Sequence, residues 1–85
     1  MIGTVTFDEL AELMNARAGL SVDPQEMKSR PDATFADFEL DSLGLLGIVA
    51  ELEKRYGQPM GADAEGCKTP RAFLDTVNGT LAAAV

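Results

Sequence analysis

The chain has 85 residues, and its 14 acidic and seven basic side chains give it a net charge of −7 at neutral pH. This charge disfavours binding to nucleic acids and to anionic membrane surfaces, and it favours basic partners. The length predicts a single small domain over residues 1–85, and a hydrophobic content of 46% is ordinary for a folded protein.

The composition also limits the kinds of chemical site that the chain can form. The chain contains no histidine and one cysteine, Cys67, so it predicts neither an internal disulfide nor a metal site, and it favours a reducing compartment. Met1–Val5 lacks the basic residues that begin a signal peptide, and no apolar run is long enough to cross a membrane. We therefore expect a cytoplasmic protein. We assign no function to Cys67, because a nucleophilic thiol needs an activating base.

A first helix is predicted from the capping box Thr6–Glu9 to about Ala18, where Gly19 stops it. The next segment, Leu20–Leu40, is long and irregular, with room for one helical turn over Pro24–Lys28. A loop of this length in a small domain is usually functional or held by its own anchors. The expected buried positions of the helix and the expected anchors of the loop are Phe7, Leu10, Ala11, Leu13, Met14 and Ala18, then Phe35, Phe38 and Leu40.

The segment Ser42–Tyr56 has a strong helical pattern, and Asp41 or Ser42 is expected to cap its first turn. A second apolar set, formed by Leu43, Leu46 and Ala50, lies on a different face and is expected to stay partly exposed. The apolar residues that should face the core recur at steps of three and four: Leu45, Ile48, Val49, Leu52 and Tyr56.

Two glycines, Gly44 and Gly47, interrupt this helix, and each costs about 1 kcal/mol relative to alanine. In ordinary helical backbone, Gly44→Ala is expected to stabilise the protein by about 0.5–1 kcal/mol. The alternative is that the missing side chain allows close packing, in which case the substitution destabilises.

A short helix is predicted at Ala62–Glu65, and a last helix begins with Thr69 as N-cap and Pro70 in its first turn. Asn78-Gly79 is interpreted as a weak point late in that helix or as its C-cap. The elements predict an all-α four-helix bundle with three principal helices, one short helix and a long loop between the first two principal helices. The buried face of the last helix should hold Phe73, Leu74, Val77 and Leu81.

Ser42 has two interpretations from the residues alone. A serine at the beginning of a helix is most often a capping residue. A phosphate on Ser42, however, would meet free backbone N–H groups at the positive end of the helix dipole, so the position also suits phosphate chemistry. The surrounding stretch from Pro31 to Glu53 has no basic residue, and its carboxylates form either a solvated surface or a docking face. These carboxylates are Asp32, Asp37, Glu39, Asp41, Glu51 and Glu53.

Three blocks carry a resemblance to a known family: Asp41-Ser42-Leu43, Leu52–Gly57, and Thr69–Arg71 with the following Leu74-Asp75 and Asn78-Gly79. Together they resemble an acyl carrier protein, in particular those of bacterial aromatic (type II) polyketide synthases. The resemblance implies that Ser42 receives a 4′-phosphopantetheine arm from coenzyme A and that Asp41 helps to present it. The arm would carry growing polyketide intermediates as thioesters.

The chain departs from the family pattern in two places. Glu39-Leu40 stands where the family often has Gly-Tyr or Gly-Met before its Asp-Ser-Leu motif. Fatty-acid carriers usually place carboxylates at or near the positions of Gly44 and Gly47, so their absence favours a specialised pathway over recognition by fatty-acid enzymes.

The resemblance also implies a monomeric, non-catalytic component with several enzyme partners: a phosphopantetheinyl transferase, a ketosynthase with its chain-length factor, a malonyl transferase, a ketoreductase and cyclases. A carrier must bind each enzyme and leave it again, which calls for a small interface steered by charge. We expect that interface on Leu43, Leu46 and Ala50. Four carboxylates should flank it without a compensating cation: Glu39, Asp41, Glu51 and Glu53.

Three other functions are weighed against this one. A carrier of fatty-acid or peptidyl intermediates would bear the same arm, although peptidyl carriers usually show Gly-Gly-x-Ser. An unmodified helical adaptor would use the Leu43 face without any arm. An enzyme with Ser42 as nucleophile is disfavoured, because the chain has no histidine and no Gly-x-Ser-x-Gly turn.

Overall fold

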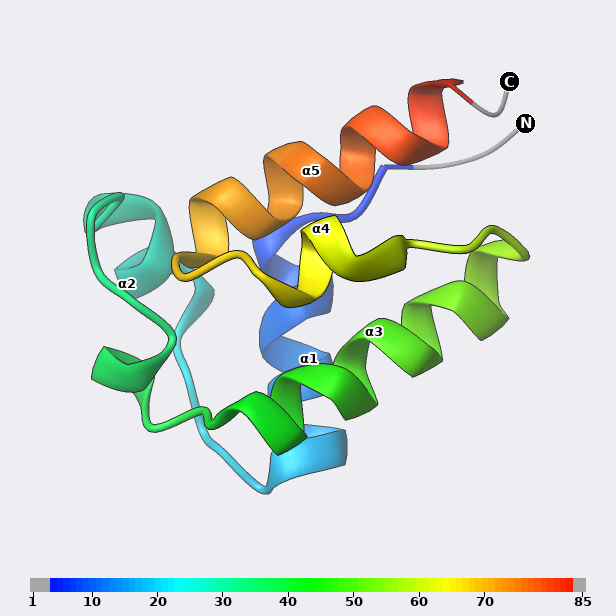
Figure 1. Ribbon diagram of the computed structural model, residues 1–85. Coiled ribbons are helices and arrows are strands. Elements are labelled where there is room, and N and C mark those ends of the chain that lie inside the picture. Colours follow the sequence, from blue (N-terminus) through cyan, green and yellow to red (C-terminus); the bar gives the residue numbers. More distant parts are fainter. Residues whose placement is uncertain (1–3, 84–85) are drawn as a thin grey trace.

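The computed structural model describes residues 4–83, and within this range it contains helices and no strand. The three long helices expected from the sequence are confirmed, and the helix Pro24–Ser29 extends the single turn predicted there by one residue. A 3₁₀ helix at Ala36–Phe38 was not predicted. In chain order the elements are α1 (Phe7–Ala18), α2 (Pro24–Ser29), η1 (Ala36–Phe38), α3 (Ser42–Tyr56), α4 (Gly61–Glu65) and α5 (Pro70–Ala83) (Figure 1).

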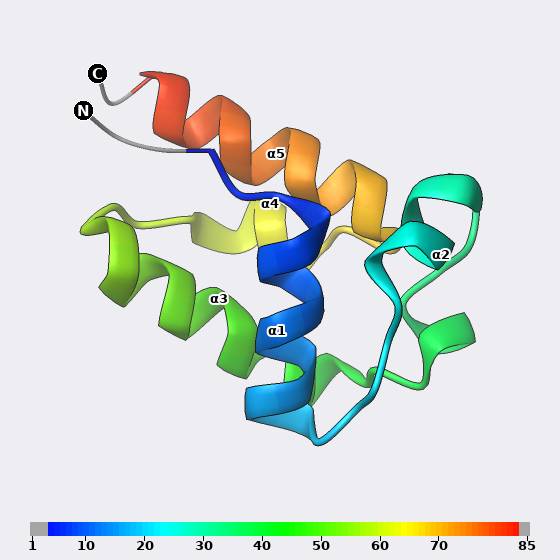
Figure 2. The same ribbon diagram turned by 180° about the vertical axis from the view of Figure 1, so that it is seen from behind.

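The helices surround one core. Helix α4 lies between α3 and α5 on one face of the molecule (Figure 1), and α1 lies between them on the opposite face (Figure 2). Helix α2 packs near the beginning of α5. Of the residues described, no helix is long and apolar enough to cross a membrane.

The predicted helix ends have the expected chemistry. The Thr6 side chain accepts a hydrogen bond from the amide of Glu9, with an O–N distance of 3.2 Å, and Gly19 ends α1 in the left-handed conformation at φ 68°. Asp23 caps α2 by accepting from the amide of Gln25 at 2.9 Å, and Pro24 occupies the first turn. Local side-chain chemistry therefore accounts for these boundaries.

The core forms where the apolar faces of α1, α3 and α5 meet. Phe73 of α5 is fully buried, and its ring meets that of Phe35 edge-on, with 5.6 Å between the ring centroids. The predicted stripes are buried except at their ends, where Phe7, Ala18 and Tyr56 are half-buried. The buried members include Leu10, Ala11, Leu13, Met14, Leu45, Ile48, Val49, Leu52, Leu74, Val77 and Leu81.

The long connection between α1 and α3 is held by its own contacts, as predicted. Phe35, Phe38 and Leu40 are buried, and the amide of Phe35 donates to the Lys68 carbonyl at 2.8 Å. This last bond ties the loop before α3 to the connection between α4 and α5. The loop therefore has a defined path into the beginning of α3.

Asn78 has a different role from the one expected. Helix α5 continues through Asn78-Gly79 to Ala83, so the C-cap interpretation is wrong. The Asn78 carboxamide accepts from the amide of Val5 at 2.8 Å and donates to the Val5 carbonyl at 3.0 Å. These two bonds pin the segment before α1 against α5, because a carboxamide can pair with a peptide group in the way that two strands do.

Candidate functional site

Ser42 is the first residue of α3, and its side chain is exposed. The cap of this helix is Asp41, whose Oδ1 accepts from the amide of Gly44 at 2.7 Å, while the Asp41 carbonyl accepts from the amide of Leu45 at 3.0 Å. Of the two capping candidates, the structure therefore selects Asp41. The Ser42 hydroxyl is not needed for capping, and it has no hydrogen-bond partner among residues 4–83.

The first amides of α3 are available to an anion. Within the described part of the chain, the N–H groups of Ser42 and Leu43 donate to no protein acceptor. They lie at the positive end of the dipole of a 15-residue helix. An exposed hydroxyl beside two free amides is a suitable place for a phosphate ester.

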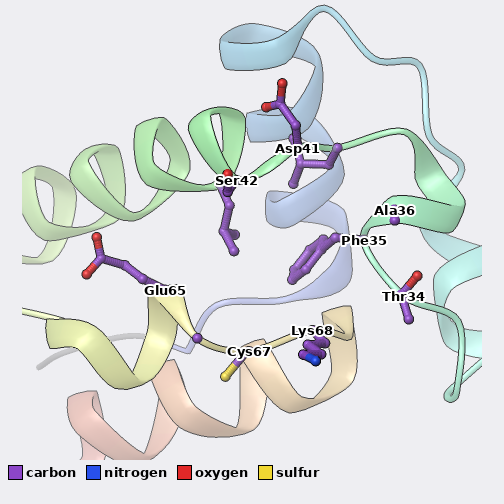
Figure 3. Close-up of a pocket in the computed structure, with 11 residues that line it drawn as sticks. Thr34, Phe35, Ala36, Asp41, Ser42, Glu65, Cys67 and Lys68 are labelled. Carbon is purple, nitrogen blue, oxygen red and sulfur yellow. The ribbon is translucent and has the colours of Figure 1, made fainter.

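An apolar hollow of about 380 Å³ opens next to Ser42 (Figure 3). One wall comes from the loop before α3 and the first turns of that helix, and the other comes from the connection between α4 and α5. The ring of Phe35 points into the space between these walls. The residues that line the hollow are Thr34, Phe35, Ala36, Leu40, Asp41, Ser42, Leu45, Glu65, Gly66, Cys67 and Lys68.

Cys67, to which the sequence assigned no function, is half-buried in the wall of this hollow. Its sulfur points towards α5 (Figure 3) and lies 3.4 Å from Oγ1 of Thr76. It also donates to the Asp63 carbonyl at 3.2 Å. These contacts make Cys67 part of the packing between α4 and α5, and sequence reasoning had no signal for its proximity to Ser42.

The second apolar face of α3 is exposed, as the sequence predicted. Leu43 retains 75% and Leu46 retains 44% of its maximal accessible surface, and Ala50 is exposed as well. Leu43 and Leu46 are the two exposed large hydrophobic side chains among the described residues. We call Leu43, Leu46 and Ala50 the apolar face of α3.

The expectation that four flanking carboxylates lack a cation is wrong for Glu51. Its side chain accepts from the guanidinium of Arg17 in α1 and, at 3.3 Å, from that of Arg55 one turn away. The bond from Arg17 is the main reason why the pKa of Glu51 is lowered. Glu53 accepts from the amide of Met60 at 2.8 Å. Packing of α1 against α3 brings in a cation that is absent from the local sequence.

The glycines of α3 face the end of α1, and they differ in the space around them. A Cβ atom on Gly44 would lie 2.7 Å from Cδ1 of Leu40, 3.2 Å from Oδ1 of Asp41 and 3.5 Å from Cβ of Ala18. A Cβ atom on Gly47 would meet Cβ of Arg17 at 4.0 Å, an ordinary contact. These contacts favour the close-packing alternative for Gly44, in which Gly44→Ala destabilises the protein.

Comparison with known proteins agrees with this geometry. Residues 8–77 match the family model described as "Phosphopantetheine attachment site". The chain is 53% identical over 85 residues to a probable acyl carrier protein of Streptomyces halstedii, covering 99% of this chain and 92% of that protein. It is 58% identical over 78 residues to the curamycin polyketide synthase acyl carrier protein of Streptomyces cyaneus, covering 92% and 88%.

Solved structures of acyl carrier proteins also match this chain. The actinorhodin holo acyl carrier protein of S. coelicolor superposes over all of both chains with a TM-score of 0.80 and 35% identity. The oxytetracycline acyl carrier protein matches with a TM-score of 0.78 and 30% identity, covering 99% of this chain and 90% of that one. The chain therefore belongs to the phosphopantetheine attachment site family, and within it to the acyl carrier proteins of the polyketide synthase type.

Proposed function

We propose that Ser42 carries a 4′-phosphopantetheine arm and that the protein uses this arm to present growing polyketide intermediates to the enzymes of a synthase. The observation that carries the proposal is the exposed, unbonded hydroxyl of Ser42 at the first position of α3, beside two free amides. Capping by Asp41 supports it further, because the cap fixes the first turn without using the serine.

Attachment requires the Ser42 hydroxyl to act as a nucleophile. Its oxygen would form a bond to phosphorus in the pyrophosphate of coenzyme A, the P–O bond to the adenosine bisphosphate would break, and the hydroxyl proton would pass to a base on the transferase. The free amides of Ser42 and Leu43 suit the resulting phosphodiester. When bound, the arm supplies a thiol that holds the acyl group as a thioester.

The contribution of this chain is to hold and deliver the intermediate. A tethered intermediate reaches each docked enzyme at a high effective concentration and does not diffuse away. We infer that the chain is a single carrier domain with a non-catalytic role, because the docked enzymes would act on the acyl chain. The cytoplasmic location stays a prediction from the sequence.

Enzyme partners would dock on the apolar face of α3. Leu43 and Leu46 are exposed apolar side chains within the first turns after Ser42, which is where an enzyme handling the arm must approach. Because Glu51 is neutralised by Arg17 and Arg55, the charges that steer such partners are fewer than the sequence suggested. The partners expected from the resemblance are the synthase enzymes and the transferase named above.

The test is mass spectrometry after incubation with coenzyme A, Mg²⁺ and a phosphopantetheinyl transferase. We expect one phosphopantetheine unit on Ser42, and none on Ser42→Ala, which should retain the helical circular dichroism of the wild type. Addition of phosphopantetheine to Ser21 or Ser29 would contradict the assignment of Ser42. A wild-type chain that gains no phosphopantetheine would favour the unmodified adaptor. Identical loading of Asp41→Ala would argue against presentation by the cap.

A further inference from the structure

Glu39 has an unusual backbone conformation for its residue type. It ends η1 with φ at 68°, and it is the one non-glycine residue with positive φ in the part of the chain that the structure describes. Glycine adopts this conformation without strain, whereas a side chain does so at a cost. The Glu39 side chain is exposed and makes no hydrogen bond or ion pair within residues 4–83. The fold therefore gains no visible contact from a glutamate here.

Glu39 lines a second hollow, of about 280 Å³, between the end of α1 and the beginning of α3. Its neighbours there are Arg17, Ala18, Asp41, Leu43 and Gly44. Arg17 is paired with Glu51, and Asp41 is occupied by the amide of Gly44, so Glu39 is the carboxylate without a partner in this hollow. With the exposed Leu43 beside it, the hollow fits a side chain with an apolar stem and a cationic end, that is, an arginine or a lysine.

The position of this hollow indicates which partner reaches it. Asp41 lines both this hollow and the one beside Ser42. Enzymes that act on the acyl group work at the far end of the arm, whereas the enzyme that attaches the arm must bring a phosphorus atom to the Ser42 hydroxyl itself. That enzyme must also hold the phosphates of coenzyme A, so its active site has to be cationic.

We propose that Glu39 is a recognition residue for the phosphopantetheinyl transferase, and that it binds a basic side chain at the rim of that enzyme's coenzyme A site. The inference rests on the proposed function, because it takes Ser42 as the attachment residue. In this proposal, the charge that guides attachment lies at Glu39, on the loop before α3. It does not lie at the positions of Gly44 and Gly47, at or near which fatty-acid carriers usually have carboxylates.

The experiment compares loading kinetics of the full-length chain with one transferase, coenzyme A and Mg²⁺, over a series of salt concentrations. Glu39→Gln keeps the backbone and removes the charge, whereas Glu39→Gly removes both the charge and the strain. Asp75→Asn is the matched control, since Asp75 is exposed on α5 and lines neither hollow. We expect Glu39→Gln to lower kcat/KM for loading about two- to five-fold at low salt through a higher KM, with kcat unchanged.

This loss should shrink as salt is added, because exposed charges are screened. Glu39→Gly should show the same loss while its midpoint of urea unfolding rises, and Asp75→Asn should load like the wild type. Wild-type loading by either Glu39 variant at low salt would overturn the proposal, and so would an equal loss in Asp75→Asn. If the wild type is not loaded at Ser42 at all, the proposed function fails, whereas indifferent Glu39 variants on a loaded serine overturn the recognition role alone.

Discussion

The two glycines of α3 provide a direct test of how closely α1 and the loop before α3 approach the beginning of α3. Gly44→Ala and Gly47→Ala make the same chemical change three residues apart in one helix. A methyl group at position 44 would overlap Cδ1 of Leu40 at 2.7 Å, and it would press on the capping oxygen of Asp41 at 3.2 Å. Position 47 has room for it.

The expected effects have opposite signs. Alanine in place of glycine inside a helix stabilises by about 0.5–1 kcal/mol, and Gly47→Ala should show this gain in full. At position 44 the same gain is opposed by overpacking, which costs about 1–3 kcal/mol. The Leu40 methyl group can move only by shifting a side chain that is 4% exposed and packed in the core, and the capping oxygen of Asp41 is pressed at the same time. We therefore expect Gly44→Ala to destabilise the protein by about 1 kcal/mol, the difference between these ranges.

Urea denaturation followed by circular dichroism would measure both values. For a chain of this size, a change of 1 kcal/mol moves the melting temperature by about 4–8 °C, so thermal unfolding gives an independent check. Equal stabilisation by the two substitutions would refute the close approach of Leu40 to Gly44. Destabilisation by both would instead mean that alanine is disfavoured along this whole face of α3.

Three further predictions concern the remaining contacts. Asn78→Ala should lower the free energy of unfolding by about 1–3 kcal/mol, because it leaves the N–H and C=O groups of Val5 without partners; a urea titration that matches the wild type would contradict this role. The lowered pKa of Glu51 means that its ionised form stabilises the fold above its ordinary pKa of 4.5, and that this contribution is lost as the pH falls through the lower pKa of the folded state. The difference in urea midpoint between wild type and Glu51→Gln should therefore be largest near neutral pH and should vanish in acid, and a constant difference would exclude the ion pair as its cause. Leu46→Ala should speed dissociation from a ketosynthase, one of the proposed partners, while leaving the unfolding midpoint nearly unchanged, and unaltered transfer kinetics would place the docking face elsewhere.

Much of the fold could be read from the sequence because it depends on local chemistry. The ends of α1 and α3 follow from caps that act within four residues, such as Thr6 on Glu9 and Asp41 on Gly44. Their buried faces follow from a spacing of three and four residues, which any α-helix converts into one side. The Asp41-Ser42-Leu43 motif likewise placed Ser42, the proposed attachment residue, at the first turn of a helix, and the structure has Ser42 as the first residue of α3.

Tertiary structure decided the contacts between residues that are distant along the chain. The sequence predicted that Glu51 has no cation beside it, but the packing of α1 against α3 pairs it with Arg17. The sequence also allowed Asn78 to be a C-cap, but in the fold its side chain binds the backbone of Val5. The hollow beside Ser42 needs a wall from the connection between α4 and α5, and the local pattern around the serine contains no trace of it. Periodicity determines which face of a helix is buried, but the partner of each side chain depends on the packing of whole helices, which is a property of the complete fold.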